Sequence, residues 1–265
     1  MIFSFLPNSF WVPLIFVLIT GHFTSICSSL YLHRSMTHRG VIFKPPVSFL
    51  MRLWLWLATG MNTRQWVAIH RKHHAFPDKE GDPHSPIVKG FWAIMIYGVK
   101  YYREAGRDEA MIEKYGKGCP NDWWERNVFS KYQSLGIFIL LGVYLLLFGL
   151  VWGPIVWLIQ MAWMPFIGQI VNGIGHYFGY RNTDSKDHSR NIIPVGVVIV
   201  GEELHNNHHA NPASPKFSQK WFEFDLGWVY IRILSFLGLA EINYKALKPH
   251  RLKPVKVVAP SEVEV

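Results

Sequence analysis

The sequence has little charge and little cysteine. Asp, Glu, Lys and Arg make up only 17% of its 265 residues, whereas half of the residues are hydrophobic. Ordinary soluble domains carry about a quarter charged residues, so this balance excludes a disordered chain and a coiled coil. The two cysteines, Cys27 and Cys119, are far apart and form no CxxC pair, which excludes a disulfide scaffold, a zinc ribbon and a redox pair. We therefore expect an integral membrane protein.

Two long stretches lack charge altogether. Residues 1–33 and 132–180 contain no Asp, Glu, Lys or Arg. The first is long enough to cross a bilayer once, because a transmembrane helix needs ~20 apolar residues. The second is 49 residues long and contains Gly153-Pro154, where proline removes a helical hydrogen-bond donor and breaks the helix. We therefore expect spans over about residues 10–32, 133–151 and 154–175.

Basic residues flank both uncharged stretches. Arg34 and Arg39 follow the first stretch, Lys131 precedes the second, and Arg181 follows it. Because Lys and Arg next to spans are retained in the cytoplasm, we expect the active site on the cytoplasmic face, at the inner membrane if the cell is bacterial. The net charge of +9 then reflects contact with a lipid membrane, and no nucleic-acid partner is expected.

Residues 47–61 form an apolar stretch that is interrupted by Arg52 and closed by Arg64. This stretch cannot cross the membrane, because the clustered histidines before and after it, which we expect to act together, would then lie on opposite sides. Residues 47–66 carry tryptophans that suit the headgroup boundary, namely Trp54, Trp56 and Trp66. We therefore expect an interfacial helix over about 47–66. The expected architecture is a single domain over 1–265, an all-α integral membrane protein with three to four transmembrane helices, a cytoplasmic helical cap and a loose tail over 253–265.

The thirteen histidines are clustered. Eight of them form an HxxxxH motif and two HxxHH motifs, which contain His33 and His38, then His70, His73 and His74, then His205, His208 and His209. Steps of three and four residues keep helical side chains within about a 100° arc, which is metal-ligand spacing, whereas a pair five apart diverges by about 140°. We therefore expect the helix to unwind after His33. Eight imidazoles exceed the needs of one ion and suit redox iron, so a di-metal centre is expected.

The order of these motifs around an apolar hairpin resembles the membrane fatty acid desaturases, specifically the acyl-CoA Δ9 (stearoyl-CoA type) branch. The resemblance runs from about residue 20 to 212 and includes the flanking segments 66–74, 82–86, 90–92, 172–182 and 201–205. It implies two iron ions held by nine histidines, the ninth being His176, with Asn172 bonding a metal-bound water. The i,i+4 spacing of these two residues agrees with that role. Relatives have two spans before the first motif, whereas this sequence has room for one.

The resemblance also implies the reaction. O2 activated at the two irons would remove hydrogens from adjacent carbons of a long-chain fatty acyl chain and leave a cis double bond at Δ9. The sequence has no ferredoxin-like cysteine set, so electrons must come from an external donor such as ferredoxin or cytochrome b5 with its reductase. No catalytic side chain is expected apart from the metal centre. The acyl carrier stays open among CoA, which the resemblance favours, a carrier protein and a membrane lipid.

Further residues are expected to support the metal ligands and the substrate. Carboxylates near the motifs should orient the imidazoles, and we name Glu202 and Asp82 with His84, while Glu203, Asp78 and Asp184 are equally possible by position. The resemblance places the floor of an acyl tunnel on the first span. Counting back from His33 by helical turns predicts that the tunnel is lined by His22, Ser25 and Ser29.

Two other functions are compatible with the motifs. A di-iron hydroxylase or ketolase of a lipid or hydrocarbon would use the same metals to insert oxygen. A His-rich membrane metal transporter is less favoured, because its ligands would line a path inside the spans, whereas these motifs lie at the membrane surface.

Overall fold

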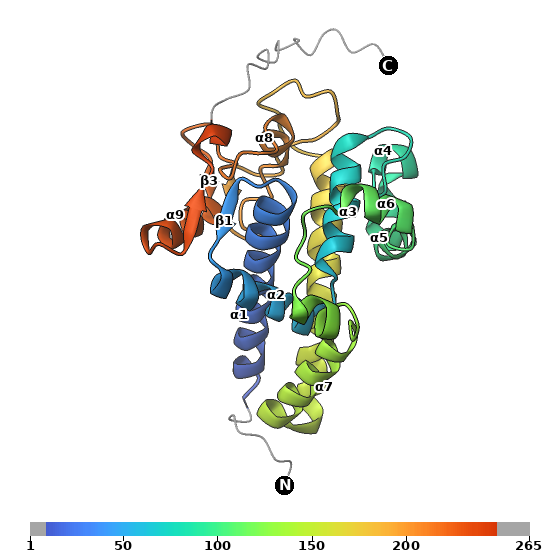
Figure 1. Cartoon of the computed structure of the whole chain (residues 1–265), viewed down its shortest axis with the longest axis vertical. Coiled ribbons are helices and arrows are strands. Elements are labelled where there is room, and N and C mark those ends of the chain that lie inside the picture. The colour runs from blue at the N-terminus through green and yellow to red at the C-terminus, as the bar shows by residue number, and fades with distance from the viewer. Residues whose placement is uncertain (1–8, 248–265) are drawn as a thin grey trace.

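The computed structural model describes residues 9–247 and is mostly helical (Figure 1). The expected tail over 253–265 lies outside the described residues. The α-helices are α1 (Trp11–Cys27), α2 (Pro45–Thr59), α3 (Thr63–Ala75), α4 (Pro86–Lys89), α5 (Phe91–Ala105), α6 (Glu109–Tyr115), α7 (Leu135–Gly173), α8 (His205–Ala210) and α9 (Leu226–Phe236). The remaining helical segments are the π-helices η1 (Ser28–Thr37) and η2 (Glu125–Phe129) and the 3-10 helices η3 (Ile174–His176) and η4 (Tyr244–Leu247).

The structure also contains four short strands, so the expected all-α class holds only for most of the described residues. β1 (Val41–Phe43) pairs antiparallel with β4 (Ala240–Ile242), and β2 (Val195–Gly196) pairs parallel with β3 (Phe224–Asp225). The first pair joins the segment after the first histidine motif to the C-terminal region, and the second pair lies within the C-terminal region. They form where long loops, rather than helices, close around the site.

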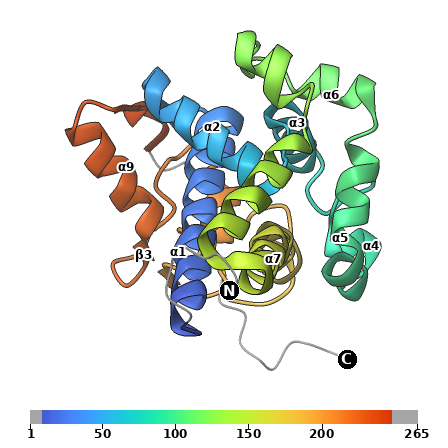
Figure 2. The same cartoon turned by 90° about the horizontal axis from the view of Figure 1, so that it is seen from below.

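Two segments are long and apolar enough to cross a membrane. These are Trp11–Thr37, which comprises α1 and η1, and Leu135–His176, which comprises α7 and η3. α1 with η1, and the later part of α7, run lengthwise through the molecule toward α8 (Figure 1). Seen from below, they occupy the centre, with α9 on one side and α4 to α6 on the other (Figure 2).

The break in the α7 hairpin is at Gly149, so the prediction of a break at Gly153-Pro154 is wrong. Gly149 has φ 74°, a conformation that glycine adopts without steric cost. The two arms are antiparallel, since Trp157 Nε1 on the second arm donates to the carbonyl oxygen of Ile137 on the first at 2.8 Å. Pro154 instead is the fifth residue of the second arm and lies inside the helix, so it does not end a span.

This shift changes the lengths of the two expected spans. The first arm, 135–148, has 14 residues and the second, 150–173, has 24. At 1.5 Å per residue they are about 21 Å and about 36 Å long. The second arm alone exceeds the ~30 Å of a bilayer core.

The expected interfacial helix over 47–66 is two helices. α2 ends at Thr59 because Gly60 adopts a left-handed conformation with φ 63°, and α3 begins after Asn62, whose side chain accepts the N–H of Gln65. Such a glycine after the last turn and an asparagine N-cap are common helix end signals. α2 lies across α1 (Figures 1 and 2), and Trp54 Nε1 donates to Thr24 Oγ1 at 2.9 Å. α3 carries the second histidine motif.

A buried arginine joins the first histidine helix to the C-terminal region. Arg34 is 1% exposed and forms two hydrogen bonds of 3.0 Å with the carboxylate of Asp225. It also donates to the carbonyl oxygens of Val200 and Pro215, both at 2.8 Å. A Cβ on Gly201 would lie 2.5 Å from Arg34 Nη2, so glycine is required beside the guanidinium. The planar fork of arginine matches this bidentate geometry.

Candidate metal centre

The first histidine motif lies on a π-helix. His33 and His38 are joined by the backbone hydrogen bond from His38 N to the carbonyl oxygen of His33, and their ring centroids are 5.0 Å apart. Hydrogen bonds between residues i and i+5 widen the turn and bring residues five apart onto one side. The two rings therefore converge as predicted, but through a widened helix rather than an unwound one.

Five histidines from three motifs form one cluster, with ligand atoms all within 4.8 Å of one another. We call it the five-histidine cluster: His33, His38, His70, His74 and His208. The Nε2 atom of His208 lies 2.9 Å from that of His33 and 3.0 Å from that of His74. The Nε2 atoms of His74 and His70 are also 3.0 Å apart.

Four other histidines form a second cluster within the same distance limit. The four-histidine cluster consists of His73, His176, His205 and His209. The Nε2 atoms of His73 and His209 are 3.3 Å apart, and those of His176 and His205 are 2.9 Å apart. His176, named from the resemblance alone, thus lies with the motif histidines.

Each HxxHH motif is divided between the two clusters. The i and i+4 rings of α3 join the five-histidine cluster and its i+3 ring joins the other, while α8 does the reverse. The sequence pattern indicates one face per motif but does not show this division. Two short helices can therefore serve two adjacent sites, because steps of three and four residues diverge on opposite sides of the first ring.

Four buried carboxylates accept hydrogen bonds from ring Nδ1 atoms. Glu202 pairs with His33 at 2.7 Å, Asp82 with His73 at 2.9 Å, Asp78 with His176 at 2.8 Å and Asp187 with His209 at 3.0 Å. Such partners fix the tautomer and the orientation of metal-binding imidazoles.

The tautomers make the clusters fit metal ions. A ring that donates through Nδ1 keeps its lone pair on Nε2, so the lone pairs of His73 and His209 face each other at 3.3 Å. Two facing lone pairs repel each other in the absence of a cation. A metal cation between them would be coordinated by both nitrogens, which removes the repulsion. The donor set of each cluster is therefore suited to a transition metal, because imidazole is a preferred ligand of iron, copper and zinc.

Burial keeps the rings neutral. It lowers the pKa of His70, His74, His205 and His208 well below the ordinary histidine value. Burial also lowers the pKa of His209 to about 4, against the hydrogen bond to Asp187, which raises it. Metal ligation requires deprotonated nitrogen. The protein therefore presents lone pairs rather than protons at neutral pH.

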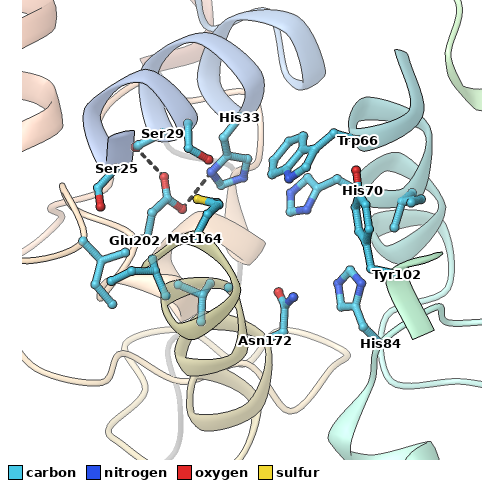
Figure 3. Close-up of a pocket in the computed structure, with 16 residues that line it drawn as sticks. Ser25, Ser29, His33, Trp66, His70, His84, Tyr102, Met164, Asn172 and Glu202 are labelled. Atoms are coloured by element: carbon cyan, nitrogen blue, oxygen red, sulfur yellow. Dashed lines mark hydrogen bonds and ion pairs between the residues drawn. The ribbon is translucent and has the colours of Figure 1, made fainter. Parts of the chain in front are cut away.

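A cavity of about 90 Å³ lies against the five-histidine cluster (Figure 3). His33, His70 and Glu202 line its cluster side, and the remaining wall is largely apolar or small, with Ser25, Ser28, Ser29, Trp66, Ile69, His84, Tyr102, Met164, Ile167, Gly168, Val171, Asn172 and Ile199. Ser29 Oγ also lies 2.5 Å from Glu202 Oε1. Ser29 and Glu202 therefore both line the cavity and belong to the hydrogen-bonded chain that orients His33.

The tunnel residues predicted from helical turns are only partly at the cavity. Ser25 and Ser29 line it, whereas His22 is half-buried on α1 and does not contribute to its wall. The count assumed a regular α-helix, but the π-helix begins at Ser28 and shifts the angular position of earlier residues relative to His33. Ser28, which the count omitted, lines the cavity instead.

His84 and Asn172 lie at the cavity outside the five- and four-histidine clusters, although His84 forms a third group of possible metal ligands with His73 and Asp82. His84 stacks on His73 with ring centroids 4.5 Å apart, and its buried Nε2 has no hydrogen-bond partner among the described residues. Burial lowers its pKa to about 3. Asn172 points into the cavity from α7 (Figure 3).

The structure separates the carboxylates that the sequence could not rank. Asp78, Asp82 and Glu202 contact histidine rings, but Glu203 accepts backbone N–H groups of Ile199 and Gly201. The Asp184 side chain is 75% exposed and lies 4.0 Å from Arg181. Asp187, three residues later, is the fourth partner and was not predicted. Its spacing to Ser189, whose N–H it accepts, is a turn signal that does not identify a histidine partner.

Comparison with known proteins gives a consistent result. A family model described as fatty acid desaturase matches residues 9–239. The chain is 34% identical over 247 residues to the sn-1 stearoyl-lipid 9-desaturase of Anabaena variabilis, covering 90% of this chain and 87% of that protein. It is 34% identical over 245 residues to the protein of the same name from Synechocystis sp., covering 90% and 74%. It is 32% identical over 247 residues to an acyl-CoA 5-desaturase of Anemone leveillei, covering 90% and 72%.

Proposed function

The chain belongs to the fatty acid desaturase family, and from this premise we propose that it introduces a cis double bond, at Δ9, into a long-chain fatty acyl chain with a di-iron centre, O2 and an external electron donor. The observation that carries the proposal is the pair of histidine clusters beside a mostly apolar cavity. Nine imidazoles supply two sets of neutral nitrogen donors. The cavity supplies a place for hydrocarbon at one of them.

The two clusters would hold the two iron ions, one each. Bound iron would supply the oxidising power, drawn from O2, to break unactivated C–H bonds. His33, His38, His70, His74 and His208 would hold one ion, and His73, His176, His205 and His209 the other. Asn172, which lines the cavity, would bond a water at the centre.

The protein's own residues orient and shield this chemistry. The four carboxylates hold His33, His73, His176 and His209 with Nε2 turned inward. The largely apolar cavity wall would exclude water and hold one carbon pair near His33 and His70, which line it. Positioning of this kind can contribute several kcal/mol to rate acceleration. Because the first span carries the motif, we propose a membrane-embedded enzyme with its active site on the cytoplasmic face.

The carrier of the acyl chain is the finer part of the proposal. The sequence resemblance favours acyl-CoA, whereas two relatives are named stearoyl-lipid desaturases and another an acyl-CoA desaturase. The names of the first two relatives support a lipid-bound chain.

The test is expression in a host that lacks its own desaturase. Gas chromatography of the fatty acids should show a new monounsaturated product with the double bond at Δ9, absent when His208→Ala is expressed. A hydroxylated or keto product would instead show that the di-iron hydroxylase alternative is right. A short pulse with labelled stearate should give the double bond first in glycerolipid, and its first appearance in the CoA pool would assign the CoA carrier.

A further inference from the structure

A second surface, distinct from the spanning helices, carries exposed apolar side chains. Residues 191–201 contain no charged residue, and aliphatic and aromatic side chains there and near β3 are exposed. We call this set the apolar rim: Ile193, Val195, Val197, Val198, Trp221, Phe222 and Phe224. The exposed fractions reach 58% for Val198 and 95% for Trp221. Such a patch on a folded protein indicates a contact surface.

The two halves of the rim are joined by backbone pairing. Val195 on β2 is the register partner of Phe224 on β3. Trp221 and Phe222 contact each other with ring centroids 5.8 Å apart. The rim is therefore one fixed surface rather than two separate loops.

The rim is tied to α1 at a defined depth. The carbonyl oxygen of Val200, two residues after Val198, accepts hydrogen bonds from Arg34 Nη2 at 2.8 Å and from Ser29 Oγ at 3.3 Å. Val200 has φ 61°, a rare conformation for a β-branched residue that persists only where surrounding contacts determine it. The chain therefore turns at this point, with Ile199 facing the cavity and Val198 facing outward.

That depth coincides with the edge of the bilayer. Eighteen residues separate Trp11, the start of α1, from Ser29, a rise of about 27 Å, and the hydrocarbon core is about 30 Å thick. The rim therefore lies beside the first span at the level where apolar chains meet headgroups. Lys216 and Lys220 come just before its aromatic residues, and basic residues beside Trp are typical of that boundary.

We propose that the apolar rim is seated in the lipid of the bilayer surface, so that the C-terminal region holds the metal centre to the membrane independently of the spanning helices. Lipid is favoured over a second copy of the chain, because the rim is continuous with a transmembrane helix at the depth of its membrane boundary. This inference does not depend on which reaction the centre performs.

The experiment uses the full chain in lipid nanodiscs, with Cys119→Ser as background. Val198→Cys is labelled with bimane, and quenching by tail-brominated lipid is compared with quenching by aqueous iodide. Glu80→Cys, exposed in the loop after α3, is the matched control. We expect the Val198 probe to be quenched several-fold more by brominated lipid than by iodide, and the Glu80 probe to show the reverse.

Two results would overturn the proposal. Iodide quenching at Val198 equal to that at Glu80 would place the rim in water. Disulfide cross-linking of Val198→Cys between chains would place a second copy on it. Val195→Cys is a second reporter on the same surface, and metal content and elution volume show that each labelled variant is folded.

Discussion

The two histidine clusters are supported in different ways. In the four-histidine cluster, three of the four rings donate to carboxylates, and all four are buried. In the five-histidine cluster, only His33 pairs with a carboxylate, and His38 and His74 are half-buried. The cluster beside the cavity is thus the less tightly oriented through its side chains.

The five-histidine cluster is held through its backbone instead. Arg34, the residue after His33, donates hydrogen bonds to the carboxylate of Asp225 and to the carbonyl oxygen of Val200. Arg71 donates to the carbonyl oxygens of Met36 and Thr37 at 2.7 and 3.1 Å. One cluster is therefore fixed ring by ring, whereas the cluster beside the cavity is fixed mainly through the backbone of the segments that carry its rings.

Loss of a ligand ring should break both sites. His73→Ala removes one of four donors and His208→Ala one of five. We expect product formation to fall below detection in both, because the proposed reaction needs two irons. Iron, measured by plasma mass spectrometry, should fall further in His73→Ala. Full activity in either variant would contradict the assignment of that ring.

Loss of the single carboxylate of the five-histidine cluster should have the next largest effect. Glu202→Gln removes the charge beside His33, and loss of such partners costs about 10- to 100-fold in metal affinity or activity. Glu203→Gln is the matched control, because Glu203 is equally buried but accepts backbone N–H groups. Desaturation rates in isolated membranes measure both. Equal losses of rate in the two variants would show that a buried carboxylate is needed at both positions and that contact with His33 has no special effect.

Loss of one carboxylate from the four-histidine cluster should be milder. Asp187→Asn leaves Asp78 and Asp82 to orient two other rings, so we expect a loss of about 10-fold, at the low end of the usual range. Asp184→Asn, exposed and three residues earlier, should leave rate and iron content unchanged. A larger loss of rate in Asp187→Asn than in Glu202→Gln would show that the four-histidine cluster depends more on a single carboxylate than the five-histidine cluster does.

The smallest effect on rate is expected at the cavity. Ser25→Leu adds volume to its wall, so the preferred acyl chain should shorten while iron content stays at the wild-type level. His22→Leu, on α1 but outside the wall, is the control. Gas chromatography of products from mixed chain lengths measures the shift. An unchanged profile in an active Ser25→Leu variant would remove this face from the substrate site.

Much of the site could be predicted because its chemistry is local in the sequence. The histidine motifs followed from their spacing, and His176 followed from the family resemblance, which the family match confirms. Two apolar segments were also found from the absence of charge. The acyl-CoA branch was not resolved, because the relatives carry both kinds of name.

The rest depended on backbone conformation and on long-range packing. Nothing in the residues around His33 distinguishes a π-helix from an unwound one, and Gly149 resembles the other glycines of the hairpin until its φ is known. Asp187 reaches His209 only because the loop between α7 and α8 folds back. A loop residue and a helix residue 22 positions apart leave no periodic signal, unlike ligands on one helix face.

The Arg34–Asp225 pair also sets an order of events during synthesis. These residues are 191 positions apart, and His33 is 175 positions from His208. At about 5–20 residues per second, roughly 9 to 38 s pass between synthesis of the first motif and synthesis of these partners. Contacts of such long sequence separation form late in folding, because the chain loses the entropy of closing a long loop before the contacts can stabilise it. The supported metal centre is therefore completed only after Asp225 has been made, and a chain stalled before Asp225 would expose an unpaired guanidinium to the quality control of the cell.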